Sequence, residues 1–118
     1  MPYAYRKSER LRKNRDFSAV MQQGKRSSVD GLSLFYAKNG TENFRIGIAV
    51  SGKLANAVNR NRLRRRIRAS AAKAIGIAAR GYDLVFVARQ GLIDAESGRI
   101  LKAVETVLAR TVLGSSGT

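Results

Sequence analysis

The nine-residue run RNRLRRRIR, residues 60–68, contains six arginines and only two apolar side chains, Leu63 and Ile67. The apolar positions around the run recur at the spacing of one helix face: Leu63, Ile67, Ala71 and Ala74. We therefore expect a long helix from about Ala57 to the Ala78 region. Such a helix buries one narrow stripe and presents guanidinium groups over the rest of its surface.

No acidic residue occurs between Asn43 and Tyr82, a span that holds ten lysines and arginines. A solvated helix face normally mixes charges of both signs. The whole chain has 23 basic and 8 acidic residues and a formal net charge of +15, which repels itself in a compact domain. Arginine also forms bidentate bonds to phosphate and stacks on bases. This pattern predicts a nucleic-acid partner, and a large folded RNA in particular.

Several function classes lack their usual residues. The sequence contains neither cysteine nor histidine, which removes thiolate ligands, cysteine nucleophiles and the commonest general base. The acidic residues are scattered, so we expect no catalytic residue and no metal site in the chain. The sequence contains no stretch of about 18 apolar residues, so we expect no membrane-spanning helix. The charged N-terminal segment lacks an apolar signal core, so we expect a cytoplasmic protein without a membrane partner.

The remaining periodicities predict a single α+β domain of order α-β-β-(β)-α-β-α. The expected elements are a helix at Arg15–Gln23, strands at Leu32–Ala37, Phe44–Val50 and Tyr82–Ala88, and a helix at Glu96–Leu113. Residues 25–29 form a possible further edge strand. We expect the strands on either side of the turn at 39–43 to pair as a hairpin. The strand Tyr82–Ala88 has apolar residues on both faces, which favours a central position.

The segments outside the domain are polar. Residues 1–13 are basic and predict an extended arm, residues 14–113 form the domain, and residues 114–118 predict a disordered tail. Within the domain, Asn56 is a good cap for the long helix. Asn61 lies between two arginines and has no helix-propensity reason to be there, which favours a polar contact.

The segment IGIAVSGKLANAVNRNRLRRRIR, residues 46–68, resembles the signature of the protein subunit of bacterial ribonuclease P. The resemblance continues through RLRKNRDFSAVMQQGKR, residues 10–26, and GYDLVFVARQG, residues 81–91. Three positions depart from the family pattern. Gly52 replaces a usual lysine, Ala55 replaces a usual glycine, and Met21 stands where an aromatic residue is common.

The resemblance implies an α/β sandwich like the second domain of ribosomal protein S5, with a left-handed βαβ crossover at the long helix. It also implies a ribonucleoprotein that removes the 5′ leader of precursor tRNA, with catalysis and Mg²⁺ binding by the RNA and no small-molecule substrate. The residues implied to contact the catalytic RNA are Lys53, Arg60, Asn61, Arg62, Arg65, Arg66 and Arg68. Those implied to line a leader cleft are Phe17, Met21, Phe35 or Tyr36, and Arg45.

Three other interpretations stay open from the residues alone. A ribosomal or RNA-chaperone protein has a similar composition. A DNA-binding regulator would need a recognition helix preceded by a helix and a turn, whereas the basic helix here follows a predicted strand. A protein-only nuclease would need catalytic residues that the sequence does not group together.

Overall fold

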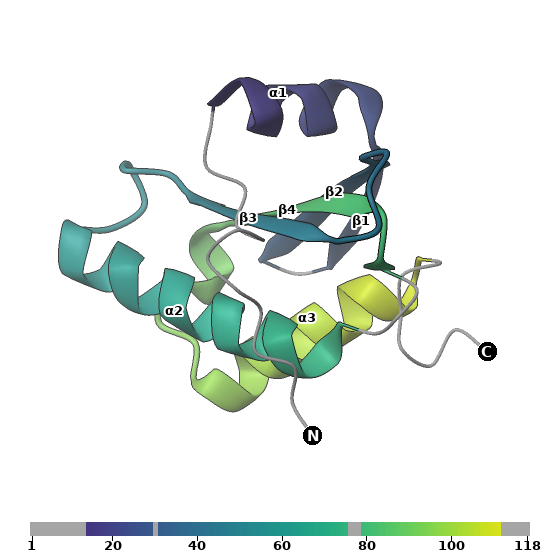
Figure 1. The fold of residues 1–118 in the computed structure, drawn as a ribbon. Coiled ribbons are helices and arrows are strands. Elements are labelled where there is room, and N and C mark those ends of the chain that lie inside the picture. Colours follow the sequence, from purple (N-terminus) through teal and green to yellow (C-terminus); the bar gives the residue numbers. More distant parts are fainter. Residues whose placement is uncertain (1–13, 30, 76–78, 112–118) are drawn as a thin grey trace.

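The computed structural model describes residues 14–29, 31–75 and 79–111 (Figure 1). Within these ranges the chain forms three α-helices, four strands and a short 3₁₀ helix. In chain order they are α1 Asn14–Gln23, β1 Lys25–Val29, β2 Leu32–Lys38, β3 Arg45–Val50, α2 Ala57–Ala74, β4 Tyr82–Ala88, η3 Gln90–Leu92 and α3 Ser97–Ala109. The expected α+β domain is confirmed, and the possible edge strand is β1.

The four strands form one mixed sheet in the order β1-β2-β4-β3. β1 pairs antiparallel with β2, β2 pairs antiparallel with β4, and β4 pairs parallel with β3. The expected hairpin between β2 and β3 is therefore wrong, because β4 lies between them. β4 is buried along most of its length, and the central position covers its apolar side chains on both faces.

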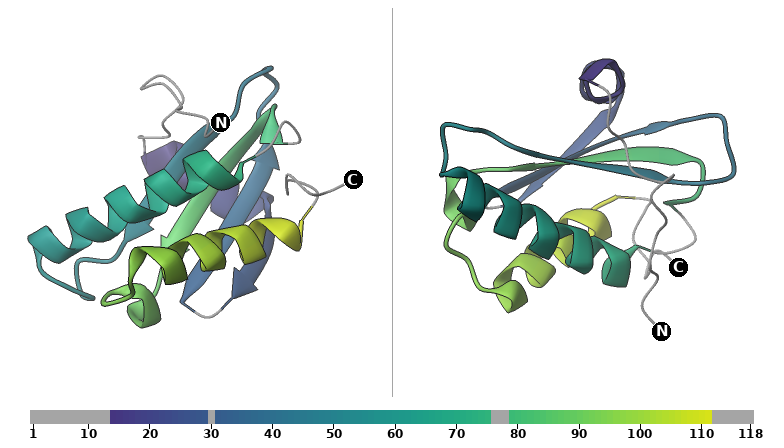
Figure 2. Two further views of the ribbon diagram at one scale, coloured as in Figure 1. Left: turned by 90° about the horizontal axis from the view of Figure 1, so that it is seen from below. Right: turned by 60° about the vertical axis from the view of Figure 1, so that its left-hand side comes forward.

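Helices cover both faces of this sheet. α1 lies alone on one face, whereas α2 and α3 lie side by side on the other (Figures 1 and 2). The main core lies between the sheet and the α2–α3 layer, and includes Leu34, Phe86, Leu63, Ile67 and Ile100. A smaller cluster around Val20 and Val85 holds α1 on the opposite face. The strand alternation thus divides the sheet into a core face and an α1 face.

Both long helices end earlier than expected. α2 ends at Ala74 because Ile75 takes an extended conformation and is buried in the core. α3 ends at Ala109, and Thr111 donates both its backbone N–H and its hydroxyl to the Leu108 carbonyl. The similarity to the second domain of ribosomal protein S5 and the left-handed βαβ crossover stay predictions. The arm 1–13 and the tail 114–118 lie outside the described residues.

No helix in the described ranges is both long enough and apolar enough to span a bilayer. The backbone of these ranges contains no cis peptide bond.

Candidate RNA-binding surfaces

The helix α2 is fixed at its start by the expected cap. The Asn56 side-chain oxygen accepts a hydrogen bond of 2.9 Å from the backbone N–H of Asn59, which satisfies one of the unpaired donors of the first turn. Leu63 and Ile67 are buried against the sheet and α3. Because one stripe of α2 is buried in this way, its arginines are divided between two flanks of the helix.

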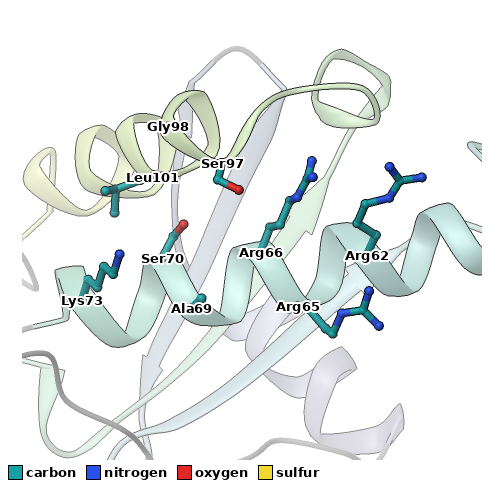
Figure 3. A pocket seen from close by; sticks show the side chains of 9 residues that line it. All are labelled: Arg62, Arg65, Arg66, Ala69, Ser70, Lys73, Ser97, Gly98 and Leu101. Atoms are coloured by element: carbon teal, nitrogen blue, oxygen red, sulfur yellow. The ribbon is translucent and has the colours of Figure 1, made fainter.

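The first flank forms a hollow of about 560 Å³ between α2 and the start of α3 (Figure 3). Its lining in the described part of the chain contains four basic residues, two serines and no acidic residue: Arg62, Arg65, Arg66, Ala69, Ser70, Lys73, Ser97, Gly98 and Leu101. The first turn of α3 adds the positive end of a helix dipole beside these cations. The hollow is therefore suited to a phosphate group.

The arginines of this flank have different surroundings. Arg66 donates from Nη1 to the backbone carbonyl of Ala95 over 2.9 Å and so ties α2 to the segment before α3. Arg62 donates to the side-chain oxygen of Asn59. Figure 3 shows Arg62 and Arg66 on the side of α3, whereas Arg65 points away from it. Arg65 is exposed, and no described residue forms a hydrogen bond with its side chain.

On the other flank, Arg60 holds the loop that precedes α2. Its Nη1 donates to the carbonyls of Ala55 at 2.7 Å and Gly52 at 3.4 Å. Arg64 donates to the side-chain oxygen of Asn61 over 2.9 Å, so Asn61 orients an arginine at the surface. Arg68 Nε is buried without a hydrogen-bond partner among the described residues.

The structure thus places the predicted RNA-contact residues along α2, with Lys53 exposed in the loop before it. Arg60 and Arg66 also donate hydrogen bonds to backbone carbonyls of the protein. The prediction omitted Lys73, which follows Arg66 by seven residues and was recoverable from helical periodicity. It also omitted Ser97, which no local signal places beside α2.

The second candidate surface lies on the α1 face of the sheet. A Cβ atom on Gly47 would lie only 2.6 Å from Phe17 Cζ, so the Phe17 ring packs directly on the β3 backbone. Met21 is 42% exposed on the same helix. Phe35 is half-buried on this face, and the Arg26 guanidinium lies 5.6 Å from its ring centroid. Arg26 was not predicted, although it is the cross-strand partner of Phe35.

Tyr36 does not belong to this surface. It lies on the core face of β2, is 8% exposed and packs near Tyr82, with ring centroids 6.2 Å apart. Because successive strand residues point to opposite faces, only Phe35 of the two aromatic alternatives shares the face of Phe17. The placement of Tyr36 in the leader cleft is therefore corrected.

Arg45 is on the expected face but is engaged with the protein itself. It donates from Nε and Nη2 to the two oxygens of Asp83 at 2.8 and 2.6 Å. Asn39 donates to the same carboxylate at 3.0 Å. Hydrogen bonding to Asp83 raises the pKa of the Arg45 guanidinium above its ordinary value, so it stays charged throughout the neutral range. Arg45 therefore links β3 to β4 at the border of the surface on the α1 face.

The domain has an arginine-rich helix without acidic residues, packed on a mixed sheet, and a second face that is basic and aromatic. Together these features define an RNA-binding protein of the ribonucleoprotein class. The family model for ribonuclease P matches residues 5–112. The ribonuclease P protein component of Brevibacillus brevis is 41% identical over 103 residues, which cover 86% of this chain and 79% of that protein. The chain therefore belongs to the ribonuclease P protein family.

Solved structures give the same result. A mutant of the Staphylococcus aureus RNase P protein with defective mRNA degradation activity has a TM-score of 0.80 and 31% identity, covering 91% of each chain. The RNase P protein of Thermotoga maritima has a TM-score of 0.78 and 29% identity, covering 87% of this chain and 97% of that one. The family resemblance seen in the sequence is thereby confirmed.

Proposed function

We propose that this chain is the protein component that binds the catalytic RNA of ribonuclease P and the 5′ leader of precursor tRNA. The observation that carries the proposal is the hollow between α2 and α3, in which four basic side chains lie beside the start of α3 and no described lining residue is acidic. The contacts to the catalytic RNA come from α2 and from Lys53. The leader lies along the α1 face, against Phe17, Met21 and Phe35.

The chemical step belongs to the RNA in this proposal. The RNA would bind the Mg²⁺ ions that the holoenzyme requires, and these ions would supply Lewis-acid chemistry for the phosphodiester cleavage. Among the described residues, no three acidic side chains lie close enough together to hold a metal ion. The protein side chains neutralise phosphates and hold the leader in place, which favours the bound geometry. The protein acts in the cytoplasm, where precursor tRNA is processed.

The test is precursor tRNA cleavage at low Mg²⁺ concentration by a bacterial ribonuclease P RNA, with and without this protein. We expect the protein to stimulate correct removal of the 5′ leader. Stimulation that is equal for substrates with long and very short leaders would contradict the leader contact. RNA binding without any stimulation would favour a ribosomal or RNA-chaperone function instead.

A second assay addresses catalysis by the chain alone. The Staphylococcus aureus mutant described above is defective in mRNA degradation activity, so mRNA is a relevant second substrate. For this chain, we expect RNA-free protein to leave both precursor tRNA and mRNA intact in the presence of Mg²⁺. Cleavage that purifies together with the protein and persists after nuclease-inhibitor treatment would show that the chain itself is a nuclease.

A further inference from the structure

A second hollow, of about 240 Å³, lies where α1 leads into β1. It is lined by Gln23, Lys25, Tyr36, Ala37, Lys38 and Tyr82. None of these residues was assigned to the surfaces of α2, and Tyr82 had no assigned role. The hollow is smaller than the sites that take drug-sized ligands, so it suits a fragment the size of one nucleobase.

The strand register places this hollow at a distance from the start of α2. Tyr82 pairs with Lys38, and the neighbouring Asp83 pairs with Arg45 at the start of β3. α2 follows the other end of β3, after Val50. The five steps along β3 separate the two ends by about 16 Å. The described residues that line this hollow include none from α2, so the hollow is separate from the one between α2 and α3.

The lining combines aromatic rings with positive charge. The Tyr36 and Tyr82 rings are tilted by 58° to each other, and Tyr82 is partly exposed. Lys25, Lys38 and Gln23 are exposed around them. None of the described residues that line the hollow is acidic. A ring beside two cations fits a ligand that is both flat and anionic, which is the chemistry of a nucleotide.

We propose that this hollow binds one unpaired nucleotide of an RNA strand. The base lies against the Tyr82 ring, the flanking phosphates are bound by Lys25 and Lys38, and the Gln23 amide hydrogen-bonds the base edge. Only a single strand fits, because a base within a duplex is already stacked between its neighbours. This inference rests on the proposed function in one respect, namely that RNA is the partner.

The first test uses Tyr82→Trp as a fluorescent reporter, because the chain contains no other tryptophan. We expect a single-stranded RNA oligonucleotide to quench Trp fluorescence in this variant, and a blunt duplex of the same sequence to leave it unchanged. Lys102→Trp on the exposed side of α3 is the control and should respond to neither. Equal responses to strand and duplex, or no response while RNA binds, would overturn the inference.

The second test removes the partners of the nucleotide. Lys25→Ala with Lys38→Ala should lower the slope of log affinity against log salt by about 1.4, as expected for two single-strand phosphates. Arg99→Ala with Lys102→Ala removes equal charge from α3 and should not lower the slope as much. Tyr82→Leu should weaken binding about fivefold or more, whereas Tyr82→Phe keeps the stacking ring and the affinity.

The two proposals fail differently. Urea unfolding of each variant first establishes that it is folded. If the intact protein stimulates precursor tRNA cleavage but the lysine pair behaves like its α3 control, the inference is wrong and the proposed function stands. If the intact protein neither binds RNA nor stimulates cleavage, both are wrong.

Discussion

Gly47 and Phe17 show how a single residue positions α1. The Phe17 ring occupies the space where a side chain on Gly47 would be, 2.6 Å from its Cβ position. Gly47→Ala must displace this ring and, with it, the packing of α1 on the sheet. We expect a loss of about 1–3 kcal/mol in the free energy of unfolding, as for other overpacked sites. Urea denaturation measures it.

The control for this prediction is the same change in the absence of the ring. Phe17→Ala removes the atoms that Gly47→Ala would strike, so the double variant should be more stable than the sum of the two single losses predicts. Strictly additive losses would show that the loss caused by Gly47→Ala does not come from contact with the Phe17 ring.

Gly52 is one of the three residues at which this chain departs from the family pattern, and the structure leaves room for the usual lysine. Its φ is outside the left-handed region, and an added Cβ would have Arg60 Nη1 as its nearest neighbour, at 3.8 Å. We expect Gly52→Lys to bind RNA more tightly and to steepen the salt slope by about 0.7–0.9, as for one added phosphate contact. Gly52→Gln is the uncharged control, and an equal gain in that variant would contradict a phosphate contact.

At the scale of elements, α2 has arginines with two kinds of role. Arg65 points away from α3, whereas Arg66 donates to the buried Ala95. We expect Arg65→Ala to lower the salt slope of RNA binding and to change the free energy of unfolding by less than about 0.5 kcal/mol. Arg66→Ala should also destabilise the fold by about 1–3 kcal/mol, because it leaves the Ala95 carbonyl without that donor.

The measurement pairs urea denaturation with RNA titration at several salt concentrations. If both variants lose the same stability, Arg66 does not join α2 to α3 in solution. If neither variant changes the salt slope, the hollow does not hold phosphate.

The elements themselves were predictable because their periodicity is local. The alternation in β2 already placed Phe35 and Tyr36 on opposite faces, and the apolar character of β4 on both faces indicated its central position. What covers each face depends on segments far apart in the chain. The position of α1 over Phe35 therefore could not be read from the β2 sequence, and neither could the insertion of β4 between β2 and β3.

The candidate sites divide in the same way. The arginines of α2 are contiguous in sequence, so one helix brings them together without further information. Ser97 joins them only through the packing of α3. The hollow around Tyr82 gathers residues from α1, β1, β2 and β4, and no pattern within any one of these segments indicates it.

For the whole molecule, charge has opposite effects on folding and on binding. The net charge is +15, and the only ion pair between described residues is Arg45–Asp83. Self-repulsion therefore destabilises the compact state, and salt screens it over a Debye length of about 10 Å at 0.1 M. We expect the urea midpoint to rise as NaCl increases, whereas RNA affinity falls over the same range.

Urea is the suitable denaturant here because it is uncharged and adds no screening of its own. A urea midpoint that falls with NaCl would mean that attractive pairs, such as Arg45–Asp83, outweigh the repulsion between arginines. A rising midpoint would mean that repulsion between basic residues destabilises the free protein. Bound RNA would then supply the compensating negative charge. The protein would then gain stability from RNA by linkage, and this gain should be largest at low salt, where binding is tightest and the free protein least stable.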